Sequence, residues 1–165
     1  MGVETKTKDA TGVTLKPSQY VHLHNHTHHS LLDGLSKIPK LIDTVQEMGM
    51  EAVAITDHGT MSGVLDFYKT AKAAGVKPIL GMEAYVASRS RHDRDPQKDK
   101  ARYHLTILAM NNQGYQNLMR LTTIANLEGI YYKPRIDREL LEKYSEGLII
   151  LSGCASGELG ESLRV

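Results

Sequence analysis

The stretch YVHLHNHTHHSLLDG, residues 20–34, holds five of the eight histidines of the chain, all between His22 and His29. Its first half alternates apolar and polar residues, which predicts a β-strand. The next segment, LSKIPKLIDTVQEMG (35–49), has apolar residues at helical spacing and ends at a glycine. This part of the sequence therefore predicts a strand followed by a helix, with histidines on the strand and in the connecting loop.

The same order of strand and helix recurs along the rest of the chain. We predict further strands in EAVAIT (51–56), KPILGMEAYVA (77–87), YHLTILAM (103–110) and EGLIILSG (146–153), and helices in SGVLDFYKTAKAAG (62–75), NQGYQNLMRLTTIANLEG (112–129) and DRELLEKY (137–144). Strands that alternate with helices are typical of parallel sheets with helical crossovers. The sequence thus predicts an α/β fold.

Two tracts carry no predicted element. Residues 1–17 are polar and end at Pro17, which indicates a flexible N-terminal arm before a single domain over residues 18–165. The tract SRSRHDRDPQKDKAR (88–102) alternates charges and contains almost nothing apolar. It is interpreted as a solvated surface loop, with the steering of phosphate groups as the alternative.

Composition narrows the class of protein. The 165 residues are 41% hydrophobic and 24% charged, as in ordinary globular domains, and 20 basic residues against 19 acidic ones argue against a strongly basic nucleic-acid binder. An anion would therefore have to be bound by a local group of residues and not by the overall charge of the chain. The single cysteine fits a reducing compartment, and no signal peptide or membrane span is recognisable. We expect a cytoplasmic protein without a membrane partner.

The clustered histidines predict a metal site. Side chains at i and i+2 of a strand share a face, so His24 and His26, near the carboxyl end of the predicted strand, could bind one ion. His22 precedes His24 by two residues, so we expect it on the same face but deeper, farther from the end of the strand. There it would only form hydrogen bonds. His28 and His29 fall in the loop and are expected at the rim of the site.

Other metal-competent side chains follow the later strands. Asp57 and His58 come directly after one strand, Glu83 lies late in the next, and Cys154 ends the last. In α/β folds, functional groups collect at the carboxyl ends of parallel strands. We therefore expect these groups at the same rim.

Each of these residues also has a structural interpretation. Glu83 could form a rim salt bridge, Asp33 could belong to a turn or cap a helix, and Cys154 could be a small buried apolar residue. His104 begins its apolar run instead of ending it. The pattern alone leaves open whether His104 is structural or a ligand.

The segments quoted above, together with GYQNLMRL (114–121) and YYKPRID (131–137), resemble a known family. From Tyr20 to about Glu158, they are similar in order to the polymerase-and-histidinol-phosphatase (PHP) domain at the N-terminus of the bacterial DNA polymerase III alpha subunit. The resemblance implies a (β/α)7 barrel, related to the TIM barrel, that holds up to three divalent metal ions, commonly zinc or manganese. The donor set by itself suits zinc, manganese or iron.

The resemblance also implies the ligand set and its partners. Asp57 would contact the ligands and hold them in position without binding metal itself. Catalysis would act through metals bound by His24, His26, His58 and Glu83. The full set of implied metal ligands is His24, His26, Asp33, His58, Glu83, His104 and Cys154.

One family motif has no counterpart in this sequence. No histidine follows His104, so the last Asp-x-His metal motif of the family is missing. A complete eight-unit barrel takes about 250 residues. We therefore expect a truncated barrel without polymerase regions, inactive or nearly so on its own. The exposed edge of its last strand would favour self-association.

The chemistry implied by the resemblance is phosphoester hydrolysis, because clustered metals polarise phosphoryl oxygens and activate water. In a DNA polymerase the substrate would be a DNA 3′ end, and the domain a 3′–5′ exonuclease whose partners are DNA and other replisome subunits. One alternative is a non-catalytic, metal-stabilised scaffold that docks a proofreading subunit. Another is a free-standing PHP phosphatase, which fits the ligands but not GYQNLMRL or YYKPRID.

Overall fold

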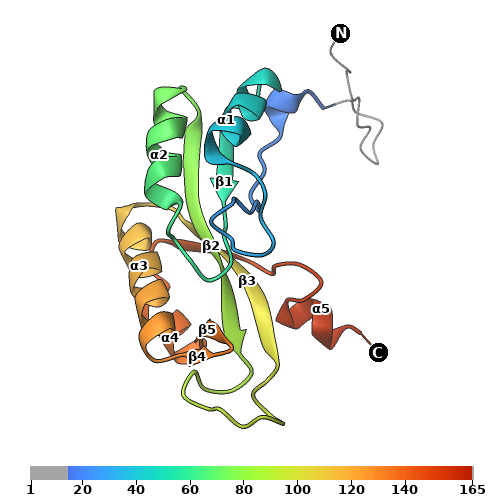
Figure 1. The fold of residues 1–165 in the computed structure, drawn as a ribbon, viewed down its shortest axis with the longest axis vertical. Helices are drawn as coiled ribbons and strands as arrows, with labels where there is room; N and C mark the ends of the chain where they lie inside the picture. Colours follow the sequence, from blue (N-terminus) through green and yellow to red (C-terminus); the bar gives the residue numbers. More distant parts are fainter. Residues whose placement is uncertain (1–14, 165) are drawn as a thin grey trace.

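The computed structural model of the protein describes residues 15–164, so most of the predicted N-terminal arm lies outside the described residues. The described chain begins with a short 3₁₀ helix, and helices and strands follow in mixed order, with β2 followed directly by β3 and β4 by β5 (Figure 1). The elements in order are η1 (Pro17–Gln19), α1 (Ile38–Glu47), β1 (Ala52–Ile55), α2 (Val64–Ala73), β2 (Lys77–Ala87), β3 (Arg102–Ala109), α3 (Asn112–Leu127), β4 (Ile130–Tyr131), β5 (Lys133–Ile136), α4 (Arg138–Lys143), β6 (Leu148–Leu151) and α5 (Glu158–Ser162).

The strands form one mixed sheet in the order β4-β5-β2-β3-β6, with β1 paired to the first half of β2. The α/β class is confirmed. The expectation that all strands are parallel is wrong, because β3 runs antiparallel to both β2 and β6. The chain passes from β2 to β3 through a loop, residues 88–101, and not through a helical crossover, which is what a parallel neighbour requires.

The histidine-rich segment is extended but does not form a regular strand. It lies parallel to β1 through a single bridge between His22 and Val53, and the His22 carbonyl accepts from the Ala54 amide at 2.8 Å. The next hydrogen bond runs from the Thr56 amide to the Asn25 carbonyl, at 2.8 Å. Between the two bonds the acceptor advances by three residues, from His22 to Asn25, whereas the donor advances by only two, from Ala54 to Thr56. This extra residue interrupts the ladder, which is the effect of a β-bulge.

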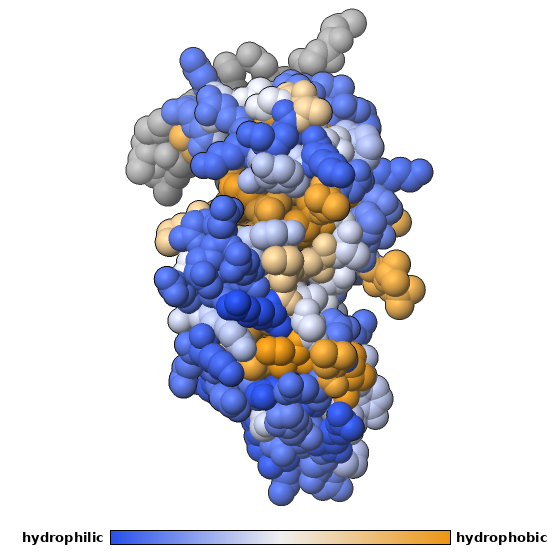
Figure 2. All heavy atoms as spheres, turned by 90° about the vertical axis from the view of Figure 1, so that its left-hand side faces the viewer, coloured by the Kyte–Doolittle hydropathy of each residue, from blue (hydrophilic) through white to orange (hydrophobic). Residues whose placement is uncertain are grey.

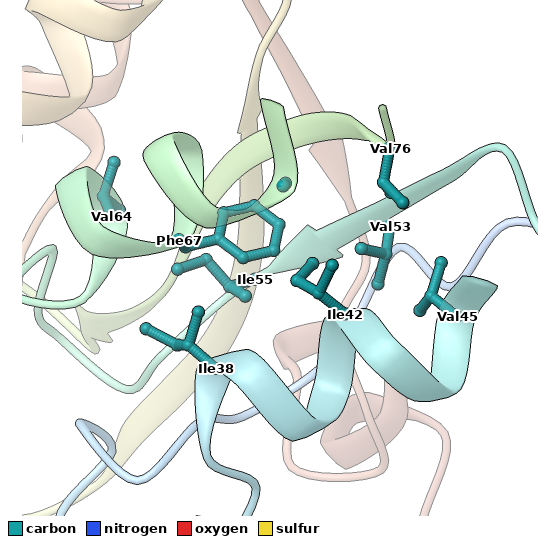
Figure 3. Packing of buried hydrophobic residues seen from close by; sticks show 9 residues of the cluster. Ile38, Ile42, Val45, Val53, Ile55, Val64, Phe67 and Val76 are labelled. Carbon is teal, nitrogen blue, oxygen red and sulfur yellow. The ribbon is translucent and has the colours of Figure 1, made fainter. Parts of the chain in front are cut away.

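One hydrophobic core lies between α1, α2 and β1. Ile38, Ile42 and Val45 recur at helical spacing on α1, and Figure 3 shows Ile38 and Ile42 pointing toward Ile55 of β1 and Phe67 of α2. All five side chains are buried. The predicted helix in 35–49 therefore forms because one apolar stripe is covered by its neighbours.

A second core lies between α3 and the central strands. Leu118 and Leu121 of α3 are fully buried, and they belong to one cluster with Met82 of β2, Ile107 of β3 and Ile136 of β5. Together the two cores cover one side of the long strand β2 at its two ends. The opposite side of β2, which carries Glu83, is not covered by either core.

The charged tract after β2 is only partly a solvated loop. The lower end of the molecule, where this loop lies in Figure 1, is hydrophilic in Figure 2. The expectation of exposure is nevertheless wrong for Arg91 and Asp99, which are buried. Their burial follows from the fully buried Arg135, whose guanidinium donates to the carbonyls of Arg91, Asp93 and Asp99 at 3.0, 2.8 and 3.4 Å.

The β4–β5 hairpin and the short helix α5 were not among the predicted elements. None of the helices in the described part of the chain combines the length and the apolar character needed to cross a membrane.

Candidate metal centre

Glu83 is the hub of a cluster of imidazoles. Its side chain is 1% exposed. His24 and His26 place their Nε2 atoms 2.6 and 2.9 Å from Oε2 of Glu83, and His104 places Nδ1 2.8 Å from Oε1. Nε2 of His58 lies 3.6 Å from Oε2. A single buried carboxylate thus faces four imidazoles from three separate parts of the chain.

Backbone pairing sets these positions. His58 follows β1 in the turn DHG, where it forms a bridge with Glu83, and the Gly59 amide donates to the Glu83 carbonyl at 2.8 Å. Gly59 has a φ of +63°, a conformation that glycine adopts without steric cost. On β3, His104 lies opposite Tyr85, two residues from Glu83, so that its side chain shares a face with that of Glu83.

Asp33 reaches the same cluster from the loop before α1. Its Oδ2 lies 2.8 Å from Nε2 of His58, and its side chain is 37% exposed. The loop is held by Ser30, whose carbonyl accepts from the Gly34 amide at 2.9 Å and whose hydroxyl accepts from the His58 amide at 3.0 Å. Asp33 lies in a turn and does not cap α1, whose N-cap is Lys37.

Cys154 lies at the edge of the cluster. Its Sγ is 3.9 Å from Oε1 of Glu83 and 3.8 Å from Nδ1 of His104. The residue is exposed, so its interpretation as a small buried apolar residue is wrong. After a small movement, the thiol could bind the same ion as Glu83 and His104.

Asp57 is adjacent to the cluster without joining it. It is buried and accepts hydrogen bonds from the amide and the hydroxyl of Thr27, at 2.6 and 2.8 Å. These bonds fix the chain directly after His26. Asp57 therefore contacts the backbone next to the candidate ligands and lies outside the cluster itself.

The remaining histidines of the first segment lie outside the cluster. His22 is exposed and packs edge-on against Tyr20, with ring centroids 4.7 Å apart, so the expectation of a deeper position is wrong. His28 and His29 follow in the turn, with ring centroids 4.3 Å apart, and His28 is exposed.

The charged state of the cluster is set by opposing effects. Burial raises the pKa of Glu83, but hydrogen bonds with His26 and His24 outweigh burial and lower its pKa to about 2. The hydrogen bond with Glu83 raises the pKa of His26, whereas burial lowers the pKa of His58. At neutral pH the site therefore holds an ionised carboxylate beside a neutral His58.

This arrangement fits divalent metal ions. The donor atoms form three groups, each with its atoms within 4.8 Å of one another: His24, His26 and Glu83; His26, Asp33 and His58; and His58, Glu83 and His104. Within the described residues, the buried Nδ1 atoms of His26 and His58 have no hydrogen-bond partner. Neutral imidazoles and carboxylates are the ligands that zinc and manganese accept.

Sequence reasoning missed three neighbours of the cluster. Ser30 and Thr27 hold the loop and are buried, but no pattern distinguishes them from other small polar residues. Tyr85 stacks on His58 with ring centroids 5.5 Å apart and meets His104 edge-on at 5.2 Å. Tyr85 could have been found, because it follows Glu83 by two residues on a predicted strand.

Comparison with known proteins gives matches over most of the chain. The PHP domain family matches residues 22–164. Proteins named DNA polymerase III subunit alpha are 50% identical over 141 residues in Borreliella burgdorferi, 51% over 148 in Campylobacter jejuni and 53% over 145 in Thermus aquaticus, which is 85%, 89% and 86% of this chain. The chain spans 12% of the length of each of these relatives. Among solved structures, an amidohydrolase from Chromobacterium violaceum matches with a TM-score of 0.47 and 23% identity, over 64% of this chain and 33% of that one.

Proposed function

This chain belongs to the PHP domain family, and from that premise we propose that its histidine–carboxylate cluster is a metal-dependent phosphoesterase site. The observation that supports the proposal is the convergence of four imidazoles on Glu83, a carboxylate buried where an unpaired charge would be costly. Buried ionised groups of this kind are paired or bind metal.

Seven residues would hold zinc or manganese ions, up to three in a complete site: His24, His26, Asp33, His58, Glu83, His104 and Cys154. When bound, such ions polarise phosphoryl oxygens and lower the pKa of water to about 7. Glu83 would stay ionised at any physiological pH, and burial keeps His58 neutral and available as a ligand. Asp33 is partly exposed, and this would place it where substrate approaches.

We further propose that residues 18–165 are the N-terminal part of a PHP domain in the alpha subunit of a bacterial replicative DNA polymerase. Three relatives of that name, each about 50% identical over most of this chain, support this origin and argue against a free-standing phosphatase. In that setting the protein would act in the cytoplasm with DNA and other replisome subunits. The substrate of the site would be a DNA 3′ end.

A second function is favoured by one observation. The cluster joins the histidine-rich segment, the turn after β1, β2 and β3, so a bound ion would brace these elements whether or not it reacts. The site would then be a metal-stabilised scaffold that docks a separate proofreading subunit.

Metal content tests the site itself. We expect the purified chain to retain zinc or manganese after dialysis, and the variant His24→Ala with His26→Ala to lose most of it. His28→Ala is the matched control, because this exposed histidine lies outside the cluster. Equal metal content in the wild type and the double variant, measured by elemental analysis, would overturn the proposal.

Hydrolysis separates the two functions. The assay follows shortening of a 5′-labelled primer from its 3′ end in the presence of manganese or zinc. A phosphoesterase predicts metal-dependent shortening that is lost in His58→Ala. Metal binding without detectable shortening, at protein concentrations well above that of the primer, would favour the scaffold.

A further inference from the structure

Two cations lie beside the cluster, on either side of Tyr85. The guanidinium carbon of Arg102 is 5.6 Å from the centroid of the Tyr85 ring, and Nζ of Lys133 is 5.7 Å from it. The same ring lies 5.5 Å from the ring of His58 and 5.2 Å from that of His104. Tyr85 therefore contacts both the candidate metal ligands and two positive charges.

The register of the sheet explains this placement. Tyr85 follows Glu83 by two residues on β2, and Arg102 precedes His104 by two residues on β3. Residues two apart on a strand share a face, about 6–7 Å from each other. The pairing of Tyr85 with His104 brings the two pairs side by side. Arg102 thus lies one such step along β3 from His104, and Lys133 lies on β5, the neighbour of β2 on its other side.

Neither charge is neutralised within the described part of the chain. Arg102 and Lys133 form no ion pair there, whereas Arg89 and Arg91 pair with carboxylates at 2.7 and 2.8 Å. Nη1 of Arg102 donates only to the Lys100 carbonyl, at 3.3 Å, and its buried Nε has no partner. A buried donor without a partner is uncommon in folded proteins, and the partly exposed guanidinium keeps hydrogen-bonding capacity that no described residue uses.

We propose that Arg102 and Lys133 bind a second phosphate group, next to the phosphate at the metal cluster. Arginine binds phosphate through parallel N–H donors, and lysine adds a point charge. A site with two adjacent phosphate positions takes a nucleic-acid strand in preference to a phosphomonoester. This inference rests on the proposed phosphoesterase function and adds to it the residues that would bind the neighbouring phosphate of the strand.

The test is binding of a 5′-fluorescent single-stranded oligothymidylate to the manganese-loaded chain, followed by fluorescence anisotropy over a salt series. Each phosphate contact on a single strand contributes about 0.7 to the slope of log affinity against log salt. Arg102→Gln and Lys133→Gln should therefore each lower that slope by about 0.7, and each should weaken binding about fivefold at 0.1 M salt.

Lys143→Gln is the matched control, because this exposed lysine also lies over a tyrosine ring, 5.3 Å from the centroid of Tyr144, but on α4. It should leave affinity and slope unchanged. Arg102→Lys, which keeps the charge, should keep the slope and guards against loss of folding in Arg102→Gln. Competition by p-nitrophenyl phosphate, a monoester, should be the same for the wild type and all variants.

Metal content separates failure of this inference from failure of the proposed function. If the variants retain wild-type metal but bind the oligonucleotide with unchanged affinity and slope, Arg102 and Lys133 do not bind phosphate. If the variants bind the oligonucleotide more weakly and also lose competition by the monoester, the two cations serve a single phosphate position and the selectivity is wrong. If the wild-type chain holds no metal, the proposed function itself fails.

Discussion

His26 and His58 approach the same carboxylate but differ in proton affinity. The hydrogen bond with Glu83 raises the pKa of His26 above its ordinary value of 6.5, whereas burial lowers the pKa of His58 below it. Metal binds neutral imidazole, so ion and proton compete. We expect metal affinity to fall as the pH drops through the pKa of His26, which is raised above 6.5, with protons released mainly from His26. Calorimetry in two buffers of different ionisation enthalpy measures this release, and pH-independent binding from pH 5 to 8 would contradict it.

Cys154 offers a second test at the level of one residue. Its Sγ lies within 4 Å of Glu83 and His104 and is exposed, so the free thiol should react readily with iodoacetamide. A coordinated thiolate is a poorer nucleophile. We expect bound metal to slow alkylation at least about tenfold, and a chelator to restore it. An alkylation rate that does not change with chelator in folded protein would exclude Cys154 as a ligand.

His104 shows why part of the site could not be derived from the sequence pattern. The pattern placed functional groups at the carboxyl ends of parallel strands, and His104 stands at the beginning of its strand. Because β3 is antiparallel, its beginning lies beside the carboxyl end of β2. The H-x-H pair, His58 and Glu83 followed from strand spacing alone, whereas His104 and Cys154 needed the family resemblance.

At the level of elements, Asp137 joins the charged loop to α4. Its carboxylate caps α4 by accepting from the Leu140 amide at 3.2 Å, and it accepts from the Arg91 amide at 2.9 Å and the Arg91 side chain at 3.1 Å. Asp137→Ala should lower the free energy of unfolding by about 2–4 kcal/mol, because it removes a cap and charge-assisted hydrogen bonds. The exposed Glu139→Ala should cost less than about 0.5 kcal/mol. Urea denaturation measures both, and equal costs would contradict this role.

The pH dependence of that stabilisation follows from the same contacts. Burial raises the pKa of Asp137, but the hydrogen bonds from Arg91 and Leu140 outweigh it, so the pKa lies below its ordinary value of 3.8. A carboxyl group with a lowered pKa in the folded state stabilises above the unfolded value. The difference between the wild type and Asp137→Ala should be complete at pH 7 and should shrink as the pH falls below 3.8.

Strand β6 lies at the edge of the sheet. It pairs with β3 on one side, no described strand pairs with its other side, and Ile149 and Ile150 are about half exposed. Free edges of apolar strands pair with other chains. We expect concentration-dependent self-association that Ile150→Lys reduces and Leu65→Lys, on an exposed position of α2, does not. Light scattering after gel filtration measures it, and a monomer at every concentration would contradict it.

The elements most visible in the sequence were those with one apolar face. The boundaries of β2 matched the prediction, and α1, α2 and α3 lie within the predicted ranges. The burial of Arg91 was not foreseen, because a run of charges normally indicates exposure. It depends on Arg135, which lies over 40 residues away and binds the loop through backbone carbonyls. Such long-range pairing leaves no periodic signal in either segment.

In the whole molecule, the cluster lies on the side of β2 opposite to the two hydrophobic cores, because Glu83 alternates with the core residues Met82 and Ala84. His26 and His58 lie next to β1, which contributes to the first core, whereas His104 lies on β3 and Cys154 follows β6. The two parts share the long strand β2, which carries Glu83 between them. Ions held by ligands from both parts would therefore oppose their separation.

This arrangement predicts that metal stabilises the entire chain and not only the site. An ion that binds the folded state alone stabilises it by about 2.7 kcal/mol when its free concentration is 100 times the dissociation constant. For a domain of this size, each kcal/mol raises the unfolding temperature by about 2–4 °C, so we expect zinc or manganese to raise it by about 5–11 °C and a chelator to reverse the shift. Thermal unfolding followed by circular dichroism measures the change. The variant His24→Ala with His26→Ala should unfold at the same temperature with and without metal, whereas His28→Ala should respond as the wild type does. A shift confined to Cys154 reactivity, without any change in unfolding temperature, would show that the ions do not link the two cores.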